Sequence, residues 1–525
     1  MIKAPGEFSF FSSFSFSLSI YSLLPIIAVL GGLLVGYVTY SYAPETVGSG
    51  LDSVIGAFHS KERIRHRVPV VKLLASAVTI GLGGSVGKEG PAAQIGGGIG
   101  SYMADKFKLS RRDAELLLLT GSAACLGAVF KSPFGAAFFV IEVLYLRDYE
   151  VEAFISCITA TFISYGIYSS FLGWSTIFIT PIYSLIPSEL PLFALLGVVC
   201  GLAGILFIAI FRTVKNKFFA SIKLNVKVKP AIGMVFIGLS FILFPYAVGT
   251  GYGYVQQVIN GVFTLSLILI FIVLKMFSTS FTVASGNSEG DFAPSLVIGG
   301  LIGGAFSIGI QSLSPSIIAQ PAIFVVVAMG AFIAAIAKTP IAAIIIVSEM
   351  SASYTVLAPA ILASVIAYVI SQRWTLYENQ LPDRTFSYAH ISDMICDIFC
   401  HIEVRKIMSV DLLKVSVNMS VKAFEELIKG TVEKIFPVVN ENDELIGLIE
   451  TDKAVNVLAE LKGNVKIGEL YTDNYLTLYP NDNLRDALHK LIVSSYDRIP
   501  VVDPNNTKKI IGMVARRDIE KVMNL

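Results

Sequence analysis

Two segments of the chain place an acidic residue directly beside a glycine, shortly before a proline and an apolar helix. They read GGSVGKEGPAAQIGG around Glu89 and GNSEGDFAPSLVIGG around Asp291. Glycine lets the backbone approach an ion closely, and proline near the first turn is typical of a helix start. A helix N-terminus offers unpaired N–H groups and a partial positive charge. Two such ends that meet would bind an anion without needing a full positive charge.

The glycines after Glu89 also have a simpler interpretation. Gly96 and Gly100 have the small-xxx-small spacing with which membrane helices pack closely. The two interpretations are compatible, because a helix that binds an ion at its start must still pack along its length.

The elements that position these loops belong to a membrane. Of the 525 residues, 54% are hydrophobic and 15% are charged, and the mean hydropathy is +0.70. A soluble globular chain has about 25% charged residues. Residues 1–373 hold 38 charged side chains with a net charge of +6, and residues 374–525 hold 41 with a net charge of −5. We therefore predict a long membrane domain followed by an acidic soluble tail, and no binding of nucleic acid.

Long stretches without Asp, Glu, Lys or Arg mark the membrane crossings, at about 20 residues for each crossing. Apolar segments broken by Gly, Pro and isolated charges lie between them and predict discontinuous helices, which enclose binding sites in membranes. Basic clusters are expected on the cytoplasmic side, and the tail with them. The charge-free stretches are 8–44, 153–188, 230–274 and 292–337, and the basic clusters are 61–67, 106–112 and 212–229.

The chain contains an internal repeat. KLLASAVTIGLGGSVGKEGPAAQIGGGIG begins at Lys72, and KMFSTSFTVASGNSEGDFAPSLVIGGLIG begins at Lys275. Ordered matches at nearly constant spacing make chance similarity a poor explanation. We expect two structural halves in inverted orientation with the site between them. Further pairs are VGSG at Val47 with VGTG at Val248, KSP at Lys131 with KTP at Lys338, and Glu142 with Glu349.

These motifs resemble the signature stretches of the CLC family of chloride channels and proton/chloride exchangers. The stretches are GSG at 48–50, GKEGP at 87–91, GDFAP at 290–294 and Tyr377 in TLYENQL. The resemblance implies a polytopic helical fold of two inverted halves with broken helices. It also implies a homodimer with a separate anion pathway in each subunit.

The resemblance also implies roles for individual residues. Ser49 and Tyr377 are similar to the pair whose hydroxyls contact the central anion, and serine at position 49 goes with a preference for chloride. Glu89 resembles the gating glutamate, whose carboxylate occupies the anion site until it is protonated. The predicted chloride-binding residues are Ser49, Tyr377, Asp291 and Phe292 (through their backbone N–H groups), Gly87, Lys88 and Glu89.

Some residues depart from the family pattern. Leu51 and Asp52 stand where the first signature has Ile-Pro, and Asp291 stands where the third has an apolar residue. An ionised Asp291 would repel an anion, so it is expected to be protonated, to be paired with a basic residue such as Lys88, or to be turned away.

Position 143 bears on the choice between a channel and an exchanger. Family exchangers usually carry an acidic residue next to the position of Glu142, and Val143 stands there. Valine cannot carry a proton, so we predict a chloride channel gated by Glu89. A proton/chloride antiporter is the alternative, and a divalent-cation transporter is an alternative from another class. Glu142 has its counterpart in Glu349, which favours a structural role.

The tail reads as two similar units, 404–462 and 465–525, each with a helical segment, a PVV strand, a polar turn and a second strand. It resembles a tandem pair of CBS domains, which often bind adenine nucleotides such as ATP or AMP. The usual ribose contact would be Asp518. Since Ala515 replaces the expected Ser/Thr, a purely structural dimerisation role is the alternative.

We therefore expect a multi-pass membrane protein with cytoplasmic tandem α/β domains, in contact with lipid, that is not an enzyme and requires no cofactor. The predicted domains are 1–388, with halves at about 22–172 and 190–372 and a terminal helix at about 375–388, then a linker at 389–403. The linker contains His390, Cys396, Cys400 and His401, whose spacing favours a helix over a metal site.

Overall fold

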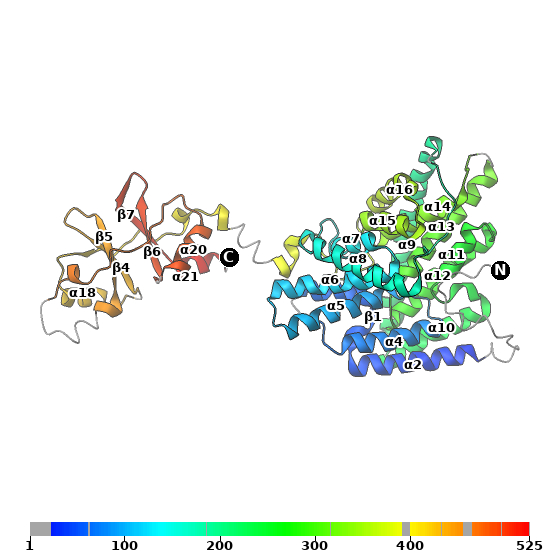
Figure 1. Ribbon diagram of the computed structural model, residues 1–525. Helices are drawn as coiled ribbons and strands as arrows, with labels where there is room; N and C mark the ends of the chain where they lie inside the picture. Colours follow the sequence, from blue (N-terminus) through cyan, green and yellow to red (C-terminus); the bar gives the residue numbers. More distant parts are fainter. Residues whose placement is uncertain are drawn as a thin grey trace. The chain divides into compact units, whose positions relative to one another are not determined.

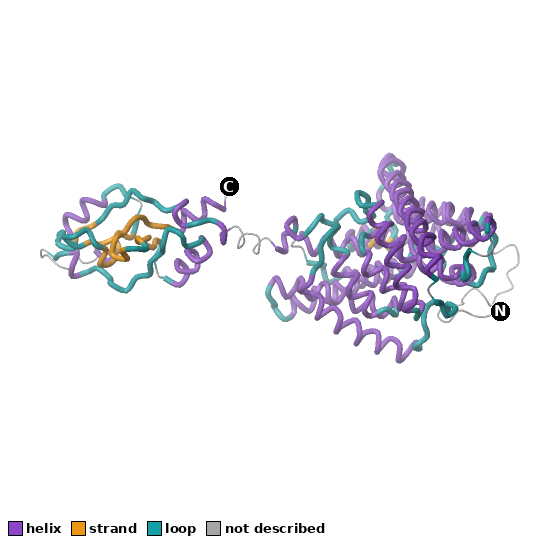
Figure 2. The backbone as a smooth tube through the Cα atoms, turned by 90° about the horizontal axis from the view of Figure 1, so that it is seen from above, coloured by secondary structure: helices purple, strands orange, loops and turns teal. Residues whose placement is uncertain are grey.

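The chain divides into two compact units, Met1–Ala389 and His390–Leu525. Figure 1 shows the computed structural model coloured along the sequence, and Figure 2 shows that the first unit is almost wholly helical, whereas the second mixes strands and helices. The structure describes residues 23–60, 63–184, 186–314, 317–390, 399–431, 433–454, 465–494 and 496–523.

Among its described residues, the first unit has two series of seven α-helices that correspond one to one and in order, with α9 (Leu190–Thr213) between them. This confirms the predicted fold of two halves. The first series is α2 (Leu24–Tyr42), α3 (Gly50–Ser60), α4 (Val68–Gly81), α5 (Glu89–Lys106), α6 (Arg111–Phe130), α7 (Pro133–Glu142) and α8 (Phe154–Leu172). The second is α10 (Lys229–Leu243), α11 (Tyr252–Ile259), α12 (Leu265–Ala284), α13 (Phe292–Leu313), α14 (Pro321–Ala337), α15 (Pro340–Ser351) and α16 (Leu357–Ile370).

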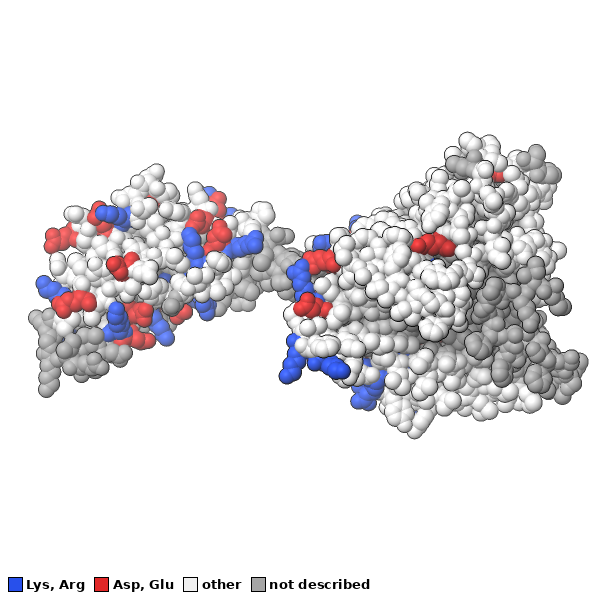
Figure 3. Space-filling model, viewed as in Figure 1, with Lys and Arg blue, Asp and Glu red and all other residues white. Residues whose placement is uncertain are grey.

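This unit is built to lie in a membrane. Among the described residues, 7 helices are long and apolar enough to cross one, and several shorter apolar helices lie between them. Many large apolar side chains, such as Phe171 and Ile155, are exposed. On the face drawn in Figure 3, charges are sparse over most of this unit, whereas the second unit carries both signs throughout. The predicted multi-pass membrane location is confirmed.

The two short helices α7 and α15 lie against each other and cap each other's first turns. Glu142 ends α7, and its carboxylate accepts hydrogen bonds from the backbone N–H groups of Ile341 (3.1 Å) and Ala342 (2.8 Å) at the start of α15. Glu349 near the end of α15 accepts from Gly135 N (2.9 Å) and from the Ser132 hydroxyl at the start of α7. These contacts satisfy N–H groups that have no partner within their own helix.

The segment after α16 differs from the prediction. Residues 375–388, all of which are described, form turns, a short 3₁₀ helix (Arg384–Phe386) and the start of another (Tyr388–His390), so the predicted terminal α-helix is wrong. Gln380 holds the segment extended, because its amide donates to the carbonyls of Val143, Tyr145 and Ala337. Pro382 also lacks the N–H group that a continuing helix would need.

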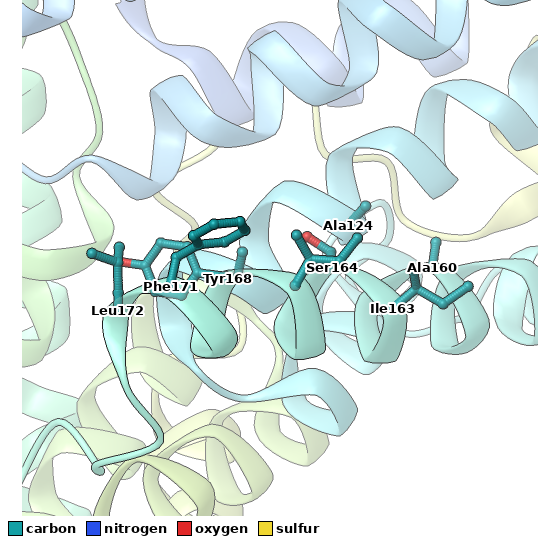
Figure 4. A pocket seen from close by; sticks show the side chains of 9 residues that line it. Ala124, Ala160, Ile163, Ser164, Tyr168, Phe171 and Leu172 are labelled. Carbon is teal, nitrogen blue, oxygen red and sulfur yellow. The ribbon is translucent and has the colours of Figure 1, made fainter.

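A hollow of about 630 Å³ lies between α6 and α8. Figure 4 shows that Phe171, Leu172 and Ile163 of α8 line it together with Ala124 of α6. The lining is apolar and opens onto the exposed side chains of α8. It therefore suits lipid chains and not an ion.

The second unit contains the two strand pairs predicted from the PVV segments. In the first pair, β4 (Ile435–Val439) runs antiparallel to β5 (Leu445–Glu450), and β3 (Val415–Ser416) is parallel to β4. In the second, β6 (Arg498–Asp503) runs antiparallel to β7 (Asn506–Ala515). Three described helices pack on these strands: α18 (Val421–Ile428), α20 (Leu484–Val493) and α21 (Arg516–Met523).

Candidate anion site

The glycine-rich loops of the two halves are joined by backbone hydrogen bonds. β1 (Gly48–Ser49) pairs in parallel with β2 (Ser288–Glu289) inside the helical unit (Figure 1). The Gly87 N–H donates to the Gly290 carbonyl at 2.6 Å. A methyl group on Gly90 would lie 2.7 Å from Gly290 Cα, so only glycine fits there. The structure thus brings together the starts of α3, α5 and α13.

A buried lysine lies beneath the corresponding loop of each half. The Lys72 ammonium donates to the carbonyls of Gly48 (2.8 Å) and Thr46 (3.1 Å), and the Lys275 ammonium donates to that of Gly249 (2.6 Å). These contacts give the loop carbonyls a buried hydrogen-bond donor. Lys72 and Lys275 begin the two repeated segments, and that shared position was the available signal for their role.

Two hydroxyl groups lie at this junction. Tyr377 is 2% exposed, and its hydroxyl donates to Oδ1 of Asp291 at 3.2 Å. Ser49 Oγ is buried and makes no hydrogen bond of ordinary geometry among the described residues, although it lies near the Asp291 carboxylate. A buried hydroxyl is normally hydrogen-bonded, so an unsatisfied one beside helix ends fits a ligand that accepts hydrogen bonds, such as a halide.

Asp291 lies at the same point. It is the N-cap residue of α13, yet its side chain accepts no hydrogen bond from the first turn of that helix. It is 4% exposed and turned to Tyr377, whereas Lys88 is exposed. Of the three arrangements expected for Asp291, pairing with Lys88 and turning away are therefore wrong.

Glu89 is the first residue of α5, and its carboxyl group lies between the two halves. It is 1% exposed, Oε1 accepts from the Tyr252 hydroxyl at 2.7 Å, and Oε2 has no partner among the described residues. A methyl group on Gly87 would overlap Oε2 and would lie 3.1 Å from the Ala293 nitrogen in the first turn of α13. The carboxylate therefore reaches the helix end where an anion would bind.

Tyr252 and Glu289 were missed in the sequence analysis. Tyr252 opens α11 directly after the VGTG motif, and that position was the available signal. Glu289 stands in the GNSEGDFAP loop on β2. It is fully buried, and neither carboxyl oxygen has a partner among the described residues.

An apolar wall adjoins the site. Phe292 is buried and packs on Phe130, with ring centroids 4.6 Å apart, and on Phe139, at 5.2 Å. Val143 is buried at the end of α7, and its carbonyl accepts from Gln380. Position 143 is thus fixed by packing and offers no titratable group.

One residue predicted to contact a nucleotide, Asp518, lies at the start of a helix in the structure. Asp518 is largely buried, and its carboxylate accepts from the Ala515 N–H at 3.0 Å at the start of α21. This is a helix-capping contact. Cys396 lies outside the described residues, and Cys400 is exposed.

Comparison with known proteins identifies the family. Residues 31–372 match the family described as voltage gated chloride channel, and residues 404–460 and 467–524 each match the CBS domain. The chain belongs to the CLC family and carries a C-terminal pair of CBS domains.

Curated relatives and solved structures agree with this assignment. The H(+)/Cl(-) exchange transporter ClcA of Vibrio campbellii is 31% identical over 365 residues, which are 67% of this chain and 78% of that protein. The protein of the same name from Salmonella paratyphi B is 31% identical over 363 residues, 67% of this chain and 76% of the other. A slow cyanobacterial Cl-/H+ antiporter has a TM-score of 0.63 and 26% identity over 67% of this chain and 84% of its own. A eukaryotic CLC transporter shares the fold over 96% of this chain and 91% of its own, with a TM-score of 0.60 and 19% identity.

Proposed function

We propose that the chain is a proton/chloride exchanger of the CLC family. The observation that carries the proposal is the position of the Glu89 carboxylate at the start of α13, the helix end at which Asp291 meets the Tyr377 hydroxyl. Two anions cannot share this place, so an entering chloride requires Glu89 to take up a proton or to leave. Proton and chloride movements are thereby linked.

The names of three relatives support exchange over a channel, since the two ClcA proteins are called H(+)/Cl(-) exchange transporters and the cyanobacterial structure is called a Cl-/H+ antiporter. Val143 was the reason to predict a channel. The buried carboxyl groups of Asp291 and Glu289 weaken that reason, because they offer titratable groups in the loop beside Tyr377. The channel is retained as the second candidate on the strength of Val143.

The experiment that tests the proposal is transport by the full chain in lipid vesicles. Chloride running down its gradient is expected to drive protons uphill, as recorded with chloride and pH electrodes. Glu89→Gln is expected to stop the proton movement and to leave chloride flux in place. If chloride moves and protons never do, the channel is correct; if magnesium moves and chloride does not, the chain is a cation transporter.

The resemblance supports two further proposals, a homodimer with one pathway in each subunit and adenine nucleotide binding by the CBS pair. The first predicts twice the subunit mass in detergent by light scattering. The second predicts that ATP or AMP raises the melting temperature of the full chain and that Asp518→Ala abolishes the effect.

A further inference from the structure

Asp291 has an unusual place for a carboxylate. An aspartate at an N-cap ordinarily accepts from N–H groups of the first helical turn. Here that bond is absent, and the buried carboxyl group instead receives the Tyr377 hydroxyl at 3.2 Å. The side chain therefore occupies the space between the α13 N-terminus and Tyr377, where the donors for an anion converge.

The charges around Asp291 do not neutralise it. Glu289 on β2 and Asp52 on α3 repel its charge, and Lys72 on α4 attracts it. From α5, the Glu89 carboxylate acts on the same Tyr377 hydroxyl. The Lys72 ammonium already donates to backbone carbonyls of the β1 loop. Ionised Asp291 and a chloride ion at this point would thus repel each other with little compensation.

Protonation of Asp291 reverses the effect of this side chain on chloride binding. A neutral carboxylic acid has one O–H donor, whereas a carboxylate can only accept. Protonated Asp291 would present a third hydroxyl-type donor to an anion, next to those of Tyr377 and Ser49.

We propose that Asp291 is a proton-carrying residue of the anion pathway, which admits chloride beside Tyr377 and Ser49 when it is neutral and excludes chloride when it is ionised. The proposal rests on the exchange function proposed above. It gives the chain a second tethered carboxylate besides Glu89, held by a different tyrosine and a different helix. Asp291, in the loop before α13, then provides the protonatable carboxyl group that position 143 lacks.

The proposal links chloride binding to proton binding at Asp291. Because chloride binds to the protonated form, the apparent chloride affinity falls tenfold for each pH unit above the range in which Asp291 loses its proton. Reciprocally, saturating chloride causes proton uptake by the protein.

The test is chloride titration calorimetry on the full chain in detergent from pH 5 to pH 8, with isethionate as the replacing anion. The Glu89→Gln background removes the other tethered carboxylate. In this background we expect the tenfold loss per pH unit, and adding Asp291→Asn should make the affinity independent of pH. Asp291→Leu, which has the apolar type usual at this position, serves as the second variant if the asparagine form does not fold.

The matched control is Glu378→Gln, which removes an exposed carboxylate one residue from Tyr377 and should retain the slope. Glu289→Gln should move the pH range and also retain the slope, because it acts on Asp291 only through charge. Equal slopes with and without Asp291 would overturn the proposal. If Ser49→Ala and Tyr377→Phe both leave chloride affinity unchanged, the proposed anion site itself is wrong, which is a separate result.

Discussion

The reciprocal caps of α7 and α15 allow a quantitative prediction about Glu142. Its two carboxylate oxygens accept from the Ile341 and Ala342 N–H groups, and the side chain is 2% exposed. A hydrogen bond to a charged group contributes about 1.5–3 kcal/mol. Glu142→Gln keeps one acceptor oxygen and turns an amide NH₂ toward the other N–H, so it should lower the free energy of unfolding by about 1.5–3 kcal/mol.

Two further variants calibrate this value. Glu142→Ala loses both bonds and should lose about 3–6 kcal/mol, a large part of the 5–15 kcal/mol that is typical of a folded domain. Glu349→Gln should lose less, about 0.5–1.5 kcal/mol, because the Ser132 hydroxyl can rotate and accept from the new amide.

The assay is unfolding in mixed detergent micelles followed by tryptophan fluorescence. The two tryptophans of the chain, Trp174 and Trp374, both lie in the first unit, so the signal reports on that unit. The reasoning is refuted if Glu142→Gln unfolds at the parental detergent concentration yet loses proton-coupled transport. That result would make Glu142 a proton carrier and not a cap.

Three further changes test other parts of the structure. Ser49→Pro should raise nitrate permeability relative to chloride, because it removes the unsatisfied Oγ donor; unchanged relative permeabilities in vesicle flux assays would exclude Ser49 from the site. Gly96→Ala should cost about 1–3 kcal/mol, since its methyl group would overlap the Gly121 carbonyl of α6, whereas Gly166→Ala in α8 meets open space and should be neutral or slightly stabilising in the same unfolding assay. Asp148 is partly buried, which raises its pKa. The hydrogen bonds from Tyr149 N and Arg384, together with the charge of the Arg384 guanidinium, outweigh burial and hold the pKa below its ordinary value of 3.8. The pair of Asp148 and Arg384 therefore stabilises the fold above pH 3.8 and loses its effect as the pH falls through the lowered pKa. Asp148→Asn should lower the free energy of unfolding by about 0.5–1 kcal/mol at pH 7 and by less at pH 3. An equal loss at both pH values would contradict this.

Local sequence signals predicted the helix starts well. The Gly-rich loop and Pro91 indicated a helix beginning near Glu89, and α5 begins at that residue. The repeat predicted two matching series of helices, and the shared spacing of Glu142 and Glu349 indicated a structural role, which the reciprocal caps bear out. These features depend on nearby residues or on a pattern that occurs twice in the chain.

The rest depends on contacts between distant segments. Tyr252 reaches Glu89 across 163 positions, and no spacing rule links a tyrosine after VGTG to a glutamate in the other half. The orientation of Asp291 is decided by Tyr377, 86 positions away. The predicted helix at 375–388 is wrong for the same reason. Gln380 donates to the carbonyls of Val143, Tyr145 and Ala337, and these contacts with distant segments outweigh the local helical pattern.

The backbone pairing of the two halves limits how the protein can move. Gly48 N donates to the Asn287 carbonyl and Gly87 N to the Gly290 carbonyl, so both halves share main-chain bonds at the site. A rocking motion that separated the halves would break these bonds in an interior without water to replace them. In the exchanger proposed above, access to the two sides of the membrane would then alternate by rotation of side chains, while the paired backbone of the two halves stays in place. The amide hydrogens of Gly48 and Gly87 should accordingly exchange with deuterium equally slowly at rest and during turnover. Faster exchange during turnover would show that the paired backbone segments of the two halves separate.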